Sequence, residues 1–430
     1  MASLVDRLRP RWLLLVIAGI AVVLGAAAAL APTIAGGDGP GRSDGPVTSG
    51  ASPTAIAAIP SPSPSKSSSA EEAAAAKAKA KAKAKAKAKA KAEAEAAALA
   101  AATPVGYAAM NGGTSGGQGA ATVHEYVLSA VAGTYGGAGD ALYTLLDEHQ
   151  DRGADEGLVI YVDTTISEEN LSESAIDVKD VQHVSILGVG TSGRLDGVGI
   201  TVTRSHDVVI RNLTIHHVDT GEKDAVSITD HSTNVWVDHN ELFSDLSVDE
   251  DYYDGLVDVK RNSEYVTISW NYIHDHWKTS LVGHEDDPSL APDNITYAFN
   301  HFQRVNSRVP LVRYAHVHVL NNYFDSIGSS AINARGGAQI LVEGNYFYRA
   351  GSGEEDSHAN QVQGPVGWWY GTDTTGYWNL RDNAFEETAY EHLSSTTDFT
   401  VPYDYAALSP GKARAAVLSG AGTGVLNIRP

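Results

Sequence analysis

Apolar residues recur in short runs from about Thr103 onward, and many of the runs end in the same word. The word is a strand-length apolar run, then Asn, any residue, and a bulky apolar residue. Runs of this length between polar residues predict β-strands, the first of them at residues 158–162, whereas residues 140–150 predict a short helix. The five clearest copies of the word are at residues 235–242, 266–273, 295–302, 317–324 and 340–347.

The asparagines of these words are regularly placed along the chain. They lie at positions 240, 271, 300, 322 and 345, at intervals of 31, 29, 22 and 23 residues, and Asn212 extends the series by 28. A strand repeat of about 20–30 residues predicts a parallel β-helix, because stacked coils bury a core that one coil could not. We expect each Asn to take the left-handed conformation at one recurring turn and to bond the Asn of the next coil. A β-sandwich or a propeller is the alternative, and irregular spacing with a constant word favours the solenoid.

The first 103 residues predict export and a spacer. Three arginines precede an apolar run at residues 12–31, so residues 1–31 predict a signal peptide or, as the alternative, an uncleaved membrane anchor. Residues 32–70 predict a disordered Pro/Ser/Gly linker, and residues 71–103 an Ala/Lys-rich spacer that could instead tether the protein to a membrane or an anionic cell-wall polymer. We expect residues 104–430 to form one catalytic domain, secreted and monomeric, or held outside the cell by the anchor.

Composition narrows the possible functions. The chain has no cysteine, which excludes disulfides, thiolate metal sites and cysteine nucleophiles. Residues 1–103 carry 13 basic and 7 acidic residues, whereas residues 104–430 carry 18 basic and 45 acidic residues, a net charge of −27. So acidic a domain excludes nucleic acid as the expected partner, because phosphate binding needs clustered Lys and Arg.

Candidate chemistry lies in the longest intervals of the repeat, where insertions place binding residues on one face of a solenoid. Asp224, Asp254 and Asp258 lie near strand starts in neighbouring coils. Carboxylates from coils about 4.8 Å apart repel unless a cation bridges them, and an oxygen-only set suits a hard cation such as Ca²⁺. Surface acids without a ligand are the alternative for each residue alone. The scarce cations Lys278, Arg308 and Arg313 could pair with these acids or bind an acidic ligand.

Four motifs in this order resemble those of the pectate lyases of polysaccharide lyase family 1. They are NVWVDH at residues 234–239, DGLVDVK at 254–260 with VTIS at 266–269, HDHWKTSLVG around Lys278, and RVPLVR at 308–313. The resemblance covers about residues 104–430. It implies a right-handed single-stranded parallel β-helix that cleaves polygalacturonate (pectate) by Ca²⁺-dependent β-elimination.

The resemblance also implies a role for each site residue. Asp224, Asp254 and Asp258 would bind Ca²⁺, Arg308 would take the proton from C5 of the uronate, and Lys278 and Arg313 would hold uronate carboxylates. Asp254 stands where some members have Glu. Of a further acidic ligand upstream of Asp224, only Glu222 is a candidate, so the number of ions stays open. An arginine is a poor base at its reference pKa above about 12, so activity should rise with pH.

Three other functions stay open. A pectin lyase acting on methylated pectin would lack the acidic cluster. A polygalacturonase would need carboxylates as general acid and base. A non-catalytic cell-surface glycan-binding β-helix could dispense with Arg308.

Overall fold

The structure is a computed structural model, and it describes residues 103–351, 355–356, 361–369, 374–388 and 393–430 together with Lys77, Lys79, Lys81 and Lys83. These residues all belong to the unit Ser69–Pro430. The predicted signal, the linker and most of the Ala/Lys tract lie outside the described residues, and the four lysines are helical and exposed. Among the residues described, no helix has the length and apolar character needed to cross a membrane.

Three parallel sheets form the domain, and successive strands pass from the first sheet to the second, the third and back. Sheet A contains ten strands: β1 (Thr122–Val127), β2 (Glu156–Val162), β5 (Gln182–Gly188), β8 (His206–Arg211), β11 (Thr233–Asp238), β14 (Glu264–Ser269), β17 (Asp293–Ala298), β20 (His316–Leu320), β23 (Gln339–Glu343) and β28 (Tyr377–Arg381). Sheet B contains nine: β3 (Thr165–Ser167), β6 (Arg194–Asp196), β9 (Thr214–His216), β12 (Glu241–Phe243), β15 (Tyr272–Lys278), β18 (His301–Ser307), β21 (Tyr323–Ile327), β24 (Tyr346–Ala350) and β29 (Ala384–Glu386). Sheet C contains eight: β4 (Ile176–Lys179), β7 (Ile200–Thr203), β10 (Val226–Thr229), β13 (Val257–Val259), β16 (Leu281–Val282), β19 (Leu311–Arg313), β22 (Ile332–Arg335) and β27 (Val366–Gly367).

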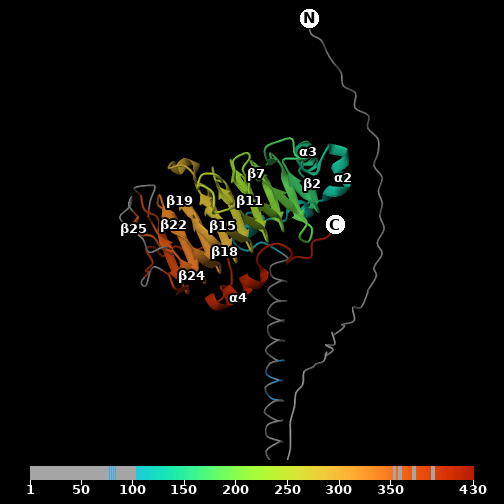
Figure 1. Cartoon of the computed structure of the whole chain (residues 1–430). Helices are drawn as coiled ribbons and strands as arrows, with labels where there is room; N and C mark the ends of the chain where they lie inside the picture. The colour runs from blue at the N-terminus through green and yellow to red at the C-terminus, as the bar shows by residue number, and fades with distance from the viewer. Residues whose placement is uncertain are drawn as a thin grey trace, which may run out of the picture. The chain divides into compact units, whose positions relative to one another are not determined.

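The predicted parallel β-helix is therefore confirmed, and its coils progress from the green end to the red end of the solenoid in Figure 1. Helices α2 (Leu128–Tyr135) and α3 (Ala138–Gln150) lie at the β2 end and bury leucines against the core. The helix predicted at 140–150 is thus present, but a strand, β1, precedes the strand predicted as first. The remaining short elements are α4 (Pro410–Gly420), three 3-10 turns (Gly106–Ala109, Gly116–Gly119 and Pro288–Leu290) and the antiparallel pair β25 (Glu355–Asp356) and β26 (Gln361–Val362).

Side chains along each strand point alternately into the core and towards the outer face of the sheet. In β11 and β14 the residues Val235, Val237, Val266 and Ile268 are fully buried in the central core, which runs the length of the solenoid. Because parallel coils keep the same register, like side chains stack on one another. Phe302, Phe324 and Phe347 form such a stack inside, with ring centroids 5.2 and 4.3 Å apart.

The asparagine ladder runs along the turn between sheets A and B. The side-chain Nδ2 of Asn271 donates to Asn300 Oδ1 at 3.0 Å and to the Val237 carbonyl at 3.0 Å, and its Oδ1 accepts from Asn240. The same bonds recur from Asn240 to Asn383, so the predicted amide ladder is confirmed. All members from Asn240 to Asn345 are fully buried.

Two details of the ladder prediction were wrong. The left-handed residue is the one before each ladder asparagine, for example His239 (φ 52°) and Trp270 (φ 52°), and not the asparagine itself. Asn212 (φ 59°) occupies that preceding position, and the backbone N–H of Leu213 bonds Asn240 Oδ1 in the place of a ladder member.

Replacing Asn271 by alanine should lower the free energy of unfolding by about 4 kcal/mol, because it removes four buried hydrogen bonds and leaves their partners unsatisfied. Urea unfolding followed by circular dichroism measures this change. Asn383→Ala, at the partly buried end of the ladder, is the matched control and should cost about half as much. Equal losses at the two positions would contradict the expected contribution of the buried ladder.

A second stack on sheet B contains buried histidines. His301 lies between Tyr272 and Tyr323, with ring centroids 5.0 Å from each, and burial lowers its pKa to about 4. The unfolded chain binds a proton there near pH 6.5, so this residue's contribution to stability is complete above that pH and is lost as pH falls from 6.5 towards 4.

His301→Phe keeps a ring in the stack and removes the titrating nitrogen. We compare the free energy of unfolding of the variant with that of the unmodified chain. The difference should favour the variant by about 2 kcal/mol more at pH 5 than at pH 8. Urea midpoints at both pH values test this, with His316→Phe as a control because the His316 side chain is 44% exposed. The same pH dependence in His301→Phe and the unmodified chain would sink the explanation.

A segment at the start of the domain crosses the strands of sheet A instead of joining them. The backbone N–H groups of Tyr107 and Ala108 donate to Thr296 and Thr267, both at 3.1 Å. Further along, Gly116 N–H donates to Asp207 at 2.7 Å and Gly117 N–H to Ser185 at 3.0 Å. Residues 105–118, here called the strap, therefore contact β17, β14, β8 and β5 in turn.

Candidate active site

The predicted site residues lie on the outer face of sheet C and at the turns that enter this sheet from sheet B. On β13, Val257 and Val259 point into the core, so Asp258 between them points outward. Asp224 precedes β10, the strand paired with β13, and Lys278 ends β15. The fold thus brings together residues from three successive coils.

Asp224 and Asp258 share one buried cation, Lys260. Lys260 Nζ donates to Asp224 Oδ2 at 2.7 Å and to Glu222 Oε2 at 3.0 Å, and lies 3.9 Å from Asp258 Oδ2. The backbone N–H groups of Gly255 and Leu281 donate to the other oxygens of the two aspartates, each at 2.9 Å. The side chains of Asp224 and Asp258 are 0% and 4% exposed, so this is a buried, hydrogen-bonded carboxylate pair.

The pair is electrostatically unfavourable. Burial, together with the Asp224 carboxylate, raises the pKa of Asp258 well above its usual range, and burial raises the pKa of Asp224 against the opposing effect of Lys260. Burial would lower the pKa of Lys260, but the carboxylates of Asp258 and Asp224 outweigh it and raise that pKa. The cluster therefore keeps a charged ammonium and still has an excess of negative charge.

Asp254 does not join the buried pair directly. Its side chain is 48% exposed, and Lys278 Nζ lies 2.9 Å from its Oδ1 and donates to Asp251 Oδ1 at 2.8 Å. These two carboxylates raise the pKa of Lys278 although burial acts to lower it. The backbone carbonyl of Asp254 accepts from His276 Nε2 at 3.0 Å, and burial lowers the pKa of His276 to about 4, so this histidine is neutral.

Arg308 occupies an unusual backbone position. It follows β18, its φ is 58°, and its carbonyl accepts from the Ser280 N–H at 2.7 Å. Left-handed backbone is uncommon for a non-glycine residue, and here it reverses the chain between sheets B and C. The half-buried Arg308 side chain has no hydrogen bond or ion pair within the described part of the chain, and its charge lowers the pKa of the neighbouring Asp251, where the bond from Lys278 has the larger effect.

Arg313 ends β19, five residues further on. Its Nε donates to Asp286 Oδ1 at 3.0 Å and its NH1 to the Gly283 carbonyl at 2.9 Å, and the side chain is 14% exposed. Arg308 thus begins, and Arg313 ends, the segment that includes β19; of these two, only Arg313 has a side-chain partner among the described residues.

Lys260 is the residue that the sequence interpretation missed. It lies two positions after Asp258 and directly follows β13, and residues at that spacing in an extended chain share a face, so the signal was available.

The carboxylates fit a hard cation. Glu222, Asp224, Asp254 and Asp258 supply only oxygen donors, and two ammonium groups, those of Lys260 and Lys278, contact these four carboxylates. A Cβ placed on Gly255 would lie 2.7 Å from Asp224 Oδ1 and 2.8 Å from Asp258 Oδ1, so both oxygens face one small space that glycine leaves open. Oxygen donors in an anionic, adaptable setting suit Ca²⁺.

A histidine group elsewhere is more compact but poorly suited to a metal. The donor atoms of Asp196, His216 and His217 all lie within 4.8 Å of one another. However, Arg194 can only donate to His216 Nε2, at 3.1 Å, so His216 must carry its proton on Nδ1, which faces His217 Nδ1 at 2.8 Å. A ligating histidine normally donates through its second nitrogen, and Arg194 opposes that arrangement.

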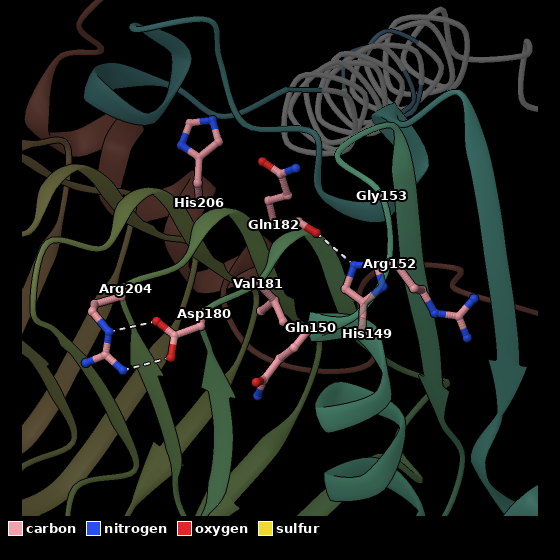
Figure 2. Close-up of a pocket in the computed structure, with 9 residues that line it drawn as sticks. All are labelled: His149, Gln150, Arg152, Gly153, Asp180, Val181, Gln182, Arg204 and His206. Atoms are coloured by element: carbon pink, nitrogen blue, oxygen red, sulfur yellow. Dashed lines mark hydrogen bonds and ion pairs between the residues drawn. The ribbon is translucent and has the colours of Figure 1, made fainter.

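A pocket of about 360 Å³ lies beside the end of α3, and none of the predicted site residues lines it (Figure 2). Two of its charged residues, Arg204 and Asp180, pair with each other. Arg204 makes two bonds to Asp180, at 2.7 and 2.8 Å, and His149 donates to the Gln182 carbonyl at 2.9 Å. The pocket therefore offers no reactive set comparable with the cluster around Lys260.

Comparison with known proteins gives a consistent family. A family model described as pectate lyase matches residues 89–426. A pectate trisaccharide-lyase of Bacillus licheniformis is 43% identical over 323 residues, which cover 75% of this chain and 86% of that protein. Pectate lyase A of Aspergillus niger is 38% identical over 323 residues, with 74% and 86% covered.

Solved structures agree. A pectate lyase from Bacillus sp. N165, solved in complex with trigalacturonate, superposes with a TM-score of 0.70 at 49% identity and covers 75% of this chain and 99% of that one. Pectate lyase C from Erwinia chrysanthemi, solved at pH 9.5 with 30 mM Ca²⁺, has a TM-score of 0.60 at 26% identity, with 76% and 99% covered.

Proposed function

This chain belongs to the pectate lyase family, and we propose that it is a secreted enzyme that cleaves polygalacturonate by Ca²⁺-dependent β-elimination. The observation that carries the proposal is the Arg308 guanidinium, which has no hydrogen bond or ion pair among the described residues, beside a cluster of four carboxylates and two lysines. Relatives described as pectate lyases, one of them solved with trigalacturonate, support the choice of substrate.

Each residue has a separate task. Arg308 takes the proton from C5, next to the uronate carboxylate, and the electron pair left behind forms the C4–C5 double bond. The C4–O bond breaks as this double bond forms, its electron pair leaves with the oxygen, and the leaving oxygen takes a proton from solvent. Lys278 and Arg313 hold uronate carboxylates and fix the sugar against Arg308.

Asp224, Asp254 and Asp258 would hold Ca²⁺, which when bound neutralises the substrate carboxylate and so makes the C5 proton more acidic. Asp254 would have to leave Lys278 for this purpose, and its 48% exposed side chain is free to turn. An arginine accepts a proton only as its minor neutral form, so the rate should rise with pH.

The test follows ultraviolet absorbance of unsaturated uronate while the purified chain acts on polygalacturonate with Ca²⁺ or with a chelator. Absorbance that grows only with Ca²⁺ supports the proposal. New reducing ends without absorbance would indicate a hydrolase, and cleavage of methylated pectin alone a pectin lyase. Binding without cleavage would indicate a glycan-binding module.

Export is tested separately by expressing the full chain and assaying the medium, the membrane and the cell wall for activity. We expect activity in the medium. Activity that stays with the membrane would favour an anchor at residues 1–31, and activity released from the wall by salt would favour a tether through the lysines of residues 71–103.

A further inference from the structure

Two of the cations proposed to bind substrate are already bonded to carboxylates of exposed loops. Lys278 is bonded to Asp251, and Arg313 to Asp286. We propose that Asp251 and Asp286 occupy, in the free enzyme, the hydrogen bonds that uronate carboxylates take when substrate binds. They would therefore set substrate affinity by competing with the substrate. This inference rests on the substrate-binding roles proposed above for Lys278 and Arg313.

The two pairs share an asymmetry of exposure. The Lys278 and Arg313 side chains are 15% and 14% exposed, whereas Asp251 and Asp286 are 78% and 50% exposed. The cations are thus held by the fold, while the acids lie at the solvent edge and can turn into water. A carboxylate arriving from solvent can replace such a partner without moving the cation.

The local contacts agree with this assignment. Lys278 ends β15 and Arg313 ends β19, so sheet pairing fixes the backbone of both residues. The Arg313 side chain also donates to the Gly283 carbonyl. Asp251 and Asp286 lie in loops between strands, at residues 244–256 and 283–292. Each loop approaches its cation with the chemical group that a uronate would present.

Arg308 provides the contrast. It lies between the other two cations in sequence and has no hydrogen bond or ion pair among the described residues. A group that must accept a proton would be disabled by a permanent carboxylate partner, whereas groups that only bind carboxylates are kept in position by one. The free enzyme therefore has its binding cations occupied and its proposed base open.

The occupants are weak competitors by their nature. An ion pair with one partner mostly in water contributes little, because solvent screens it. Neutralising either acid should accordingly strengthen substrate binding by a small factor and leave the chemical step alone. Asp254, which also contacts Lys278, is a proposed Ca²⁺ ligand, so the measurement is made at saturating Ca²⁺ and leaves Asp254 unchanged.

The experiment compares Asp251→Asn, Asp286→Asn and the double variant with the unmodified full chain on polygalacturonate. We expect KM to fall about two- to fivefold for each single variant and about tenfold for the double variant, with kcat unchanged within about twofold. Glu387→Gln is the matched control, because it removes the same charge from an exposed ion pair with Arg349. KM should not change in this control.

Three results would overturn the proposal. KM could stay the same or rise in both single variants, kcat could fall while KM is constant, or Glu387→Gln could lower KM equally through net charge. Trigalacturonate affinity is also measured by calorimetry in the Arg308→Ala background, where turnover is prevented. Tighter binding there without any absorbance in the active chain would uphold this inference and reject the proposed reaction.

Discussion

Replacing Arg308 by alanine should lower kcat on polygalacturonate by about 10³-fold, because a positioned base typically contributes about 10²–10⁴-fold. KM should change much less, since Lys278 and Arg313, the residues proposed to bind substrate, remain in place. Initial rates of absorbance increase over a range of polygalacturonate concentrations at saturating Ca²⁺ measure both constants. The melting temperature should be nearly unchanged, because Arg308 is not bonded to any of the described side chains.

Arg304→Ala is the matched control for this experiment. Arg304 has an exposed side chain on β18, the strand that Arg308 follows, and makes two bonds to Asp275, at 2.7 and 2.6 Å. Its replacement should leave kcat within about threefold of the unmodified value. If Arg308→Ala retained full kcat, or raised KM alone, Arg308 would be a binding residue and another base would be required.

Asp258→Asn should lower the activity by at least about 10²-fold. The same substitution should stabilise the Ca²⁺-free domain at alkaline pH. The loss follows from the removal of a proposed Ca²⁺ ligand. The gain follows from the raised pKa of Asp258, because a carboxyl whose pKa is raised on folding favours the folded state at low pH and loses that contribution as pH rises through the folded pKa. Asparagine can still accept the Leu281 N–H bond and has no charge to bury.

Melting temperatures at pH 5 and pH 8.5, with chelator and with Ca²⁺, test the predicted gain in stability. The variant should melt a few degrees above the unmodified chain at pH 8.5 in chelator, about equal to it at pH 5, and show no shift on adding Ca²⁺. Asp177→Asn is the positional control, because Asp177 lies on the same outward-facing row of sheet C as Asp258. The row runs from Asp177 through Thr201 and Ser227 to Asp258. A normal Ca²⁺ shift in Asp258→Asn would remove Asp258 from the proposed ligand set.

The repeat could be predicted from the sequence because the amide ladder requires one asparagine in each coil from Asn240 to Asn383. The word could not show which turn residue is left-handed, since His239 and Trp270 at that position have no common chemistry. Asn212 was therefore placed one position away from its role. The backbone bonds between coils, such as His239 N–H to the Ser269 carbonyl at 3.1 Å, impose that conformation whatever the side chain.

The candidate site was predictable as a set of residues and not as a set of contacts. The sequence interpretation named Asp224, Asp254, Asp258, Lys278, Arg308 and Arg313, and the fold places them in neighbouring coils. Their pairing depends on loops whose course no motif encodes. The bond from Lys278 to Asp251 and the bond from Arg313 to Asp286 are of this kind.

The strap has a consequence for the way in which the domain comes apart. A solenoid whose coils touch only their neighbours can melt from one end, coil after coil. Residues 105–118 bond strands as far apart as β5 and β17, so an end coil cannot open without detaching a segment that also holds the middle. Heat should therefore unfold the whole domain in one transition, with equal calorimetric and van't Hoff enthalpies. Cutting the chain near residue 118 should replace this transition by gradual unfolding from the ends.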